Sequence, residues 1–363
     1  MMRIGKFTDF YRDVTKAGTK IPQEKYLKVG HYPVIDQGRQ AIVGRWDSDD
    51  GICKEIPAII FGDHTRAIKY IEEPFFIGAD GVKILRPVNV QDNPKYLYYA
   101  LQAARIPNLG YSRHFKALKE LDFHVCSIEK QDEIVRILEK IDYLIEQCHE
   151  EDSCLNQIVK SRFIELFGDP KDNPKGYSKK QLKETCRVIT GNTPSRAVSE
   201  YYGDHIEWIK TDNIVSGLLN PTTATESLSE KGMAVSRTVE SGAILMACIA
   251  GSIASIGRVC VTDRKVAFNQ QINAIVPSDY NILFLYVMLQ ISKEYLVDEI
   301  NMALKGILSK SKLEEKTFYV PPMELQEQFA AFVTQVDKSK LAVQQGLQEL
   351  ETLKKSLMQQ YFG

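Results

Sequence analysis

The chain has 363 residues, of which 44% are hydrophobic and 26% charged, and its net charge is −1. This length excludes one small domain and suits two, and the composition is typical of a soluble globular protein. The start, MMRIGKFTDF, carries charges and lacks an apolar core, so no signal peptide is predicted. The most apolar runs, 242–257 and 282–291, are shorter than the ~20 residues of a membrane span, so we expect a cytoplasmic protein without a membrane segment.

The seven cysteines form no recognisable pattern of disulfides or metal ligands. None lies in a CxxC pair, and no Cys/His group has the spacing of a zinc site. An odd number without a secretion signal indicates free thiols in a reducing cytosol, most of them small buried side chains. We therefore predict no metal site and no cofactor.

The first block, residues 1–122, is predicted to combine short strands with helices. PAIIFG (57–62) and VKILRP (82–87) are apolar runs bounded by turn residues, which is typical of buried strands. The stretch at 93–104, NPKYLYYALQAA, has the apolar spacing of an amphipathic helix.

Residues 129–168 are predicted to form one long helix. Their apolar residues recur with a period near 3.5, which is the pattern of a coiled-coil seam. Gly168 followed by Pro170 is a signal for the end of a helix. Forty helical residues span ~60 Å, and a helix of this length with one apolar stripe must bury that stripe against another surface.

The second block, residues 169–317, has the same character as the first. Four short apolar runs in it are predicted to be strands, and one longer run is predicted to be an amphipathic helix. The strands are HIEWIK (205–210), GAILMACI (242–249), IGRVCVT (256–262) and INAIVP (272–277), and the helix is 280–300.

The last 40 residues repeat the earlier helix. Residues 324–363 align with 129–168 without a gap, at an offset of 195, and eight of the 40 positions are identical. The second copy begins with VPPMELQEQ, where Pro321 and Pro322 suit the start of a helix, and the first copy has VCSIEKQDE without prolines. The predicted plan is a domain at 1–122, a helix at 123–168, a domain at 169–317 and a helix at 318–363.

The two helices are expected to pack antiparallel on each other. The predicted fold is thus α+β, with two pseudo-repeated globular domains and two long antiparallel helices resembling a coiled coil. The alternative is two unrelated surface helices. The predicted seam consists of Ile134, Ile141, Leu144, Leu155, Phe329, Val336, Val343, Leu350 and Leu357.

The charges are unevenly distributed along the chain. The first helix has ten acidic and five basic residues, and the second has five acidic and four basic residues, so together they carry a charge of −6. Because the whole chain carries −1, the remaining residues carry about +5. Mildly basic globular blocks favour contact with nucleic acid, although ordinary solvated faces explain the charges equally well.

Four segments in order resemble one known family. They are TGNTPSRAVSEYYGDHIEWIKTDNI (190–214), the strand pair at 242–277 that ends in Phe268-Asn269-Gln270-Gln271, YPVIDQGRQAIVGRWD (32–47) with the strands after it, and VPPMELQEQ. Together with the repeat, they identify the chain as similar to the DNA-specificity subunits, often called HsdS, of type I restriction-modification systems. The resemblance covers nearly the whole chain.

The resemblance implies a function and a set of partners. Each globular block would be a target-recognition domain that reads one half of a split target in double-stranded DNA, and the helices would set the unread spacer. Two methyltransferase subunits, which modify adenine, would dock on the helix pair, and restriction motor-nuclease subunits would join for cleavage. The isolated chain is expected to form a homodimer through exposed helix surfaces.

Motifs for catalysis are absent from the sequence. DNPK occurs at 92–95 and 172–175 without the second proline and aromatic residue of an adenine methyltransferase, and 251–257 lacks the Lys-Ser/Thr of a P-loop. Asp263-Arg264-Lys265 matches the end of a nuclease motif, but so short a match arises often by chance. We expect a non-catalytic subunit. The two alternative hypotheses are a coiled-coil scaffold that binds proteins and a self-sufficient nuclease.

Polar and basic side chains on loops are the candidates for DNA contact, because these types bind phosphates and base edges. Asn269, Gln270 and Gln271 are expected instead to tie a turn to a strand edge. The candidates in the first block are Arg39, His64, Arg66, Lys69, Ser112, Arg113, His114 and Lys116. Those in the second are Thr193, Ser195, Arg196, Lys210, Thr211, Asn213, Arg237, Arg258, Lys305, Ser309 and Lys310.

Overall fold

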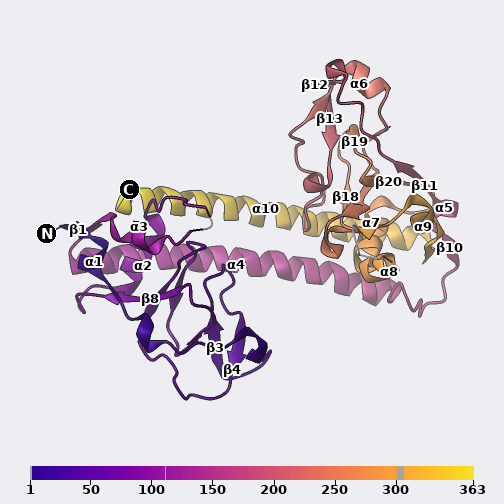
Figure 1. Cartoon of the computed structure of the whole chain (residues 1–363). Helices are drawn as coiled ribbons and strands as arrows, with labels where there is room; N and C mark the ends of the chain where they lie inside the picture. The colour runs from indigo at the N-terminus through magenta and orange to yellow at the C-terminus, as the bar shows by residue number, and fades with distance from the viewer. Residues whose placement is uncertain (1, 111, 299, 301–305) are drawn as a thin grey trace. The chain divides into compact units, whose positions relative to one another are not determined.

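The computed structural model describes residues 2–110, 112–298, 300 and 306–363 (Figure 1). The chain divides into two compact units. Unit 1 runs to Gln147 and includes Gly346–Gly363, and unit 2 is Cys148–Gln345. Each long helix contributes one part to each unit.

Unit 1 is built on an antiparallel four-stranded sheet. Its strands lie in the order β2 (Tyr11–Asp13), β8 (Val82–Pro87), β5 (Ala58–Gly62) and β6 (Ile68–Ile71). A smaller sheet has the order β4 (Gly44–Trp46), β3 (Tyr32–Ile35) and β7 (Phe76–Ile77), in which β3 and β7 are parallel. A further antiparallel pair is formed by β1 (Arg3–Lys6) and β9 (Asp122–Val125).

The helices of unit 1 close one core. They are α1 (Phe7–Phe10), α2 (Pro94–Ala103), α3 (Phe115–Lys119) and the first part of α4 (Ile128–Phe167). Leu97 of α2 and Leu138 of α4 are fully buried in this core. The end of α10 (Met323–Phe362) adds Leu357 and Phe362 to it.

Unit 2 repeats this plan. Its main sheet has the order β11 (Cys186–Thr190), β20 (Ile272–Pro277), β16 (Ile244–Ala247) and β18 (Val259–Val261). The pair β10 (Lys179–Gln181) and β22 (Thr317–Tyr319) matches β1 and β9, and the parallel pair β13 (Ile206–Ile209) and β19 (Val266–Phe268) matches β3 and β7. The predicted α+β repeat is therefore confirmed.

Unit 2 also contains the following strands and helices, of which α5 (Leu182–Thr185) and α7 (Ile282–Ile291) take the places of α1 and α2. In Figure 1, β12 and α6 lie at the end of an extension that leads away from α7. The strands are β12 (Tyr202–Gly203), β14 (Ser227–Leu228), β15 (Thr238–Val239), β17 (Ile249–Ala250) and β21 (Gly306–Ile307). The helices are α5 (Leu182–Thr185), α6 (Glu230–Ala234), α7 (Ile282–Ile291), α8 (Lys293–Val297) and α9 (Lys310–Glu315).

The two long helices have the predicted lengths and run antiparallel where they meet. In unit 2, Phe163 packs on Phe329 with ring centroids 5.4 Å apart, and Lys340 Nζ donates to Asn156 Oδ1 at 3.0 Å. The residue numbers fall along α4 as they rise along α10, which is the antiparallel order. In unit 1, Lys354 Nζ lies 2.5 Å from Asp142 Oδ1.

A buried glutamine bonds the start of each long helix to the N-cap residue of an earlier helix, Asn93 of α2 or Asn281 of α7. Gln131 Oε1 accepts from Asn93 N at 2.8 Å, and its Nε2 donates to Cys126 O at 3.0 Å. Gln326 makes the same two bonds at 2.8 Å, to Asn281 N and to the carbonyl oxygen five residues before it. The two starts are thus built alike, although only the second has prolines.

Two predicted elements are interrupted. The helix expected at 280–300 ends at Ile291 and resumes as α8, because the backbone of Ser292, at φ −82° and ψ 12°, departs from α-helical geometry. The strand expected at 242–249 divides at Cys248. The amides of Cys248 and Ile249 both donate to Gln271 O, at 2.8 and 3.3 Å, which is a bulge between β16 and β17.

Candidate nucleic-acid interface

The predicted seam residues of the long helices differ in burial. Ile134, Ile141, Phe329 and Val336 are buried, and Leu144 is exposed. The remaining predicted seam residues, Leu155, Val343, Leu350 and Leu357, are half-buried. The long helices therefore keep apolar side chains in contact with solvent, among them Tyr143, Ile158, Leu341 and Leu353.

A cluster of charged and aromatic side chains forms the most organised polar surface of unit 2. Arg196 Nη2 donates to Glu226 Oε2 at 2.6 Å, and Lys210 Nζ donates to Glu226 Oε1 at 2.5 Å. Both cations lie over the Trp208 ring, and Arg196 also lies over Tyr202. We call these five residues the Glu226 cluster. Hydrogen bonds from Lys210, which has the larger effect, and from Arg196 lower the pKa of the Glu226 carboxyl.

The loop before this cluster presents hydroxyl groups. Thr193 and Ser195 are exposed, and Thr193 Oγ1 donates to Gln270, whose side chain is also exposed. Asn269 and Gln271 have the expected structural role, because Asn269 Oδ1 accepts from Gln271 N at 3.0 Å and Asn269 N donates to Ile209 O.

Asn213 also has a structural position. It is 6% exposed, its Oδ1 accepts from Lys210 N at 3.0 Å, and its Nδ2 donates to Thr222 and Thr223. Thr211 is half-buried.

The other candidates of unit 2 are spread along the sequence from Arg237 to Lys310. Arg237 is exposed, and Arg258 is half-buried with its guanidinium donating to Ser255 O and Thr211 O, both at 3.3 Å. Ser309 caps α9 by accepting from Lys312 N, and Lys310 is exposed. Lys305 lies outside the residues that the structure describes.

In unit 1, a buried carboxylate shapes the segment that carries His114. Asp63 is 4% exposed, and its Oδ1 accepts from Phe115 N at 2.8 Å. His114 Nδ1 donates to Asp63 O at 2.9 Å, and His114 Nε2 accepts from Leu109 N at 3.1 Å. His114 is therefore buried and neutral, with its proton on Nδ1.

The neighbours of His114 are open to solvent. Ser112 and Lys116 are exposed, and Arg113 is 77% exposed with its Nε 4.0 Å from Asp63 Oδ2. This segment presents three polar or charged side chains from a fixed backbone.

The remaining candidates of unit 1 differ in exposure. Arg39 is exposed, and His64 and Arg66 are half-buried, with Arg66 Nη1 donating to Ile106 O at 3.1 Å. Lys69 is buried, and its Nζ donates to Asp36 O at 2.9 Å. Burial lowers the pKa of Lys69, against the opposing effect of Asp36.

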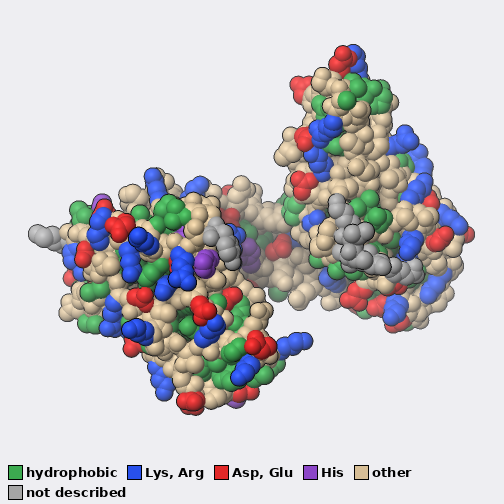
Figure 2. All heavy atoms as spheres, in the orientation of Figure 1, with side chains coloured by type: hydrophobic (Ala, Val, Ile, Leu, Met, Phe, Trp, Pro, Cys, Tyr) green, Lys and Arg blue, Asp and Glu red, His purple; other side chains and the backbone are tan. Residues whose placement is uncertain are grey.

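The face drawn in Figure 2 shows Lys and Arg mixed with Asp and Glu on both units, without a continuous basic area. The sequence did not reveal that Glu226 pairs with Arg196, because the two residues are 30 positions apart. The aromatic residues in 190–214 were the only signal, since Tyr202 and Trp208 can hold cations over their rings.

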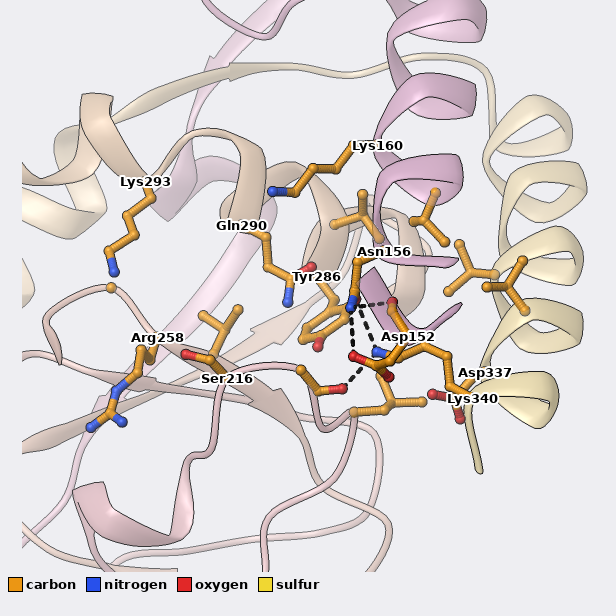
Figure 3. Close-up of a pocket in the computed structure, with 18 residues that line it drawn as sticks. Asp152, Asn156, Lys160, Ser216, Arg258, Tyr286, Gln290, Lys293, Asp337 and Lys340 are labelled. Atoms are coloured by element: carbon orange, nitrogen blue, oxygen red, sulfur yellow. Dashed lines mark hydrogen bonds between the residues drawn. The ribbon is translucent and has the colours of Figure 1, made fainter. Parts of the chain in front are cut away.

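Unit 2 also contains a cavity of about 430 Å³ between the helix pair and the block's own loops. In Figure 3 the side chains of Asp152, Asn156 and Lys340 point toward one another. Lys340 Nζ donates to Gly217 O at 2.6 Å as well as to Asn156. This lysine thus connects α10 both to α4 and to the loop at Gly217.

The described part of the chain contains no candidate metal site and no candidate membrane-spanning helix. Among those residues, no group of three or more His, Cys, Asp or Glu could hold a metal ion. No helix in the described ranges has the length and apolarity to cross a membrane.

Comparison with known proteins gives one consistent match. A family model described as "Type I restriction modification DNA specificity domain" matches residues 3–153 and 174–352. The type I restriction enzyme HindI specificity subunit of Haemophilus influenzae is 32% identical over 120 residues, which cover 32% of this chain and 25% of that protein. The MjaIX specificity subunit of Methanocaldococcus jannaschii is 27% identical over 170 residues, 45% of this chain. The match covers 38% of that protein, so both matched stretches span well under half of the relatives' lengths.

Two solved structures resemble the whole fold. The crystal structure of a type I restriction-modification system S subunit from M. genitalium has a TM-score of 0.63 and 16% identity, over 100% of this chain and 96% of that one. A second structure, described as the basis of complex assembly and conformational transition of the type I R-M system, has a TM-score of 0.51 and 17% identity, over 99% and 97%. At these identities the likeness concerns the fold.

Proposed function

We propose that this chain binds double-stranded DNA and reads a target in two halves. The premise is that the chain belongs to the family of type I restriction-modification DNA specificity proteins. The observation that carries this proposal is the double match of the family model, once on each of two units with the same strand order. Each unit would supply one recognition surface.

The surfaces that we assign to DNA contact are the exposed polar segments of the two units. In unit 1 the segment is Ser112–Lys116 without the buried His114, and in unit 2 it is the loop of Thr193, Ser195 and Arg196. Side chains of these types bind phosphate oxygens and base edges, and a fixed backbone lets them bind in one register. Arg39, Arg237 and Lys310 are further exposed candidates.

The chain would act as a non-catalytic subunit that directs catalytic partners. The family and the relatives it matches are specificity components, which agrees with the lack of catalytic motifs in the sequence. The partners would be two methyltransferase subunits and restriction motor-nuclease subunits. The matching helix starts at Gln131 and Gln326 support two similar docking surfaces. The long helices would set the spacer between the half-targets.

The isolated chain is proposed to form a homodimer. Tyr143 and Leu341 are each 59% exposed, and Ile158 and Leu353 are each 48% exposed. Apolar side chains along a helix associate when no partner covers them. Light scattering of the chain alone should give the mass of a dimer, and addition of methyltransferase subunit should replace the dimer by a mixed complex.

Selection from a pool of random duplexes tests the function. The chain is assembled with its methyltransferase subunit, and the bound DNA is sequenced. We expect a motif split into two conserved halves, and no enriched motif would favour the scaffold that binds only proteins. Arg113→Ala should weaken the contact with one half and Arg196→Ala the contact with the other, each with a loss of roughly tenfold or more in affinity.

A further inference from the structure

We propose that the Glu226 carboxylate occupies a site for a DNA phosphate group, so that Glu226 competes with DNA for Arg196 and Lys210. The inference rests on the proposed function, because it names one contact within the recognition surface of unit 2. It concerns a residue that opposes binding.

The carboxylate is held as an anion between two cations. One oxygen accepts from Arg196 at 2.6 Å and the other accepts from Lys210 at 2.5 Å. Two oxygens of a phosphate can accept from an arginine and a lysine in the same way, because both anions offer charged acceptor oxygens at similar spacing. The Glu226 side chain is 36% exposed, so a ligand from solvent can approach this site.

The cations do not depend on Glu226 alone for their positions. The Arg196 guanidinium is 4.3 Å from the centroid of the Tyr202 ring, and Lys210 Nζ is 5.1 Å from that of Trp208. Trp208 is 3% exposed, and its indole N–H donates to Asn192 O at 3.3 Å. An aromatic floor that is itself fixed keeps the two cations in place when the carboxylate leaves.

A second arginine–glutamate pair in unit 2 shows what a purely structural pair looks like. Arg264 donates to both oxygens of Glu207, at 2.6 and 3.0 Å, and also to Asp263 and to the carbonyls of Pro221 and Thr222. Its donors are therefore occupied by the protein.

Arg196 differs from Arg264 because most of its guanidinium N–H donors have no acceptor among the described residues. Among the residues that the structure describes, its only hydrogen-bond acceptor is Glu226. Its side chain is 56% exposed, whereas that of Arg264 is 32% exposed. Arg196 is thus a donor group that faces solvent and is neutralised by one carboxylate.

The test measures binding of the full chain, assembled with its methyltransferase subunit, to a random-sequence duplex at about 50 to 200 mM salt. Glu226→Gln keeps the shape of the side chain and removes its charge. We expect roughly tenfold tighter binding at the lowest salt and a steeper dependence of log affinity on log salt, by about one phosphate contact. The matched control is Glu240→Gln. It changes the net charge equally, but within the described ranges the carboxylate of Glu240 pairs with a single cation, Lys265, at 2.7 Å.

The outcomes separate the inference from the proposed function. Binding of Glu226→Gln that equals that of Glu240→Gln, or is weaker than wild type, overturns the inference and makes Glu226 an ordinary supporting residue. If Arg196→Gln is present, Glu226→Gln should lose most of its gain. A wild-type complex that binds no DNA at any salt removes the proposed function itself. Glu226→Asp retains the charge on a shorter side chain. It should fold, and its affinity for DNA should lie between those of the wild type and of Glu226→Gln.

Discussion

The two units differ in the contact between a short helix, α2 or α7, and a matching carboxylate on a long helix. In unit 1, Asp142 of α4 accepts from the Tyr99 hydroxyl at 2.7 Å and pairs with Lys354. The matching carboxylate of unit 2 is Asp337. Val287 lies six residues after Asn281, the N-cap of α7, as Tyr99 lies six residues after Asn93, the N-cap of α2. Val287 and Asp337 both line the cavity of about 430 Å³ (Figure 3). Tyr99 thus donates to the carboxylate of the long helix in unit 1, whereas Val287 lines a cavity together with the matching carboxylate in unit 2.

The comparison shows which parts of a repeat are kept. The glutamine bonds to backbone groups at the starts of the long helices are the same in both units, because an unpaired amide or carbonyl costs free energy where it is buried. Side chains that fill space can change, since a neighbouring loop can contribute contacts in their place. In unit 2 the loop at Gly217 and the side chain of Lys340 take part in this compensation.

The largest effect is expected at the two buried glutamines. Gln131→Leu and Gln326→Leu each remove an acceptor from a half-buried amide and a donor from a buried carbonyl, so each should destabilise its unit by roughly 2–4 kcal/mol. Gln131 also donates to Asp92 Oδ1 at 2.9 Å, so its loss should cost more. Amide hydrogen exchange, followed peptide by peptide, measures each unit separately. Equal loss of protection in both units would contradict this order.

The next effect concerns the filled contact of unit 1. Tyr99→Phe leaves Asp142 without the hydroxyl donor, and the expected cost is about 1–3 kcal/mol for unit 1. Val287→Phe, at the matching position, adds a ring to the cavity of unit 2 and should cost little or stabilise the unit. Thermal unfolding of the two variants, with hydrogen exchange to assign the unit, tests this. A strongly destabilised Val287→Phe would mean that the cavity cannot accept a ring.

The sequence predicted the helices and sheets better than the surface. The heptad spacing and the repeat placed α4 and α10 within one residue of their ends, and the strands at 82–87 and 272–277 were placed at the observed residues. These elements follow from local periodicity. The interruption at Cys248 depends on the amides that share Gln271 O, and the one at Ser292 on a local backbone angle, and periodicity contains neither.

The candidate interface depended on contacts that the sequence does not order. His114 and Lys69 are types that bind DNA, but both are buried and bonded to the backbone of unit 1. Residue type alone did not reveal their burial, since the partners Asp63 and Asp36 lie 51 and 33 positions away. Glu226, which carries the further inference, is acidic and so was outside a search for basic and polar side chains.

The loop of unit 2 held by Lys340 gives a smaller effect. Lys340→Met keeps much of the buried stem and removes the bonds to Gly217 O and Asn156, at an expected cost of about 1–2 kcal/mol. Faster hydrogen exchange should appear in the loop at Gly217, while the loops of unit 1 are unchanged. Lys338→Met, an exposed lysine of the same helix, is the matched control. Identical exchange in both variants would show that Lys340 does not hold the loop.

The smallest effect should have opposite signs at the matching carboxylates. Burial raises the pKa of Asp337 above its ordinary 3.8, and Lys340 lowers it, whereas the carboxylate of Asp142 is paired. A raised pKa means that the folded state holds the proton more tightly, so this contribution favours folding below the unfolded pKa and is lost as pH rises through the folded pKa. Asp337→Asn should therefore stabilise unit 2 at neutral pH by less than about 1 kcal/mol, with the gain disappearing near pH 4. Asp142→Asn should destabilise unit 1 at neutral pH, because Lys354 loses its partner. Urea unfolding at several pH values measures both variants, and a shared sign would show that the two sites are electrostatically alike despite the missing ring.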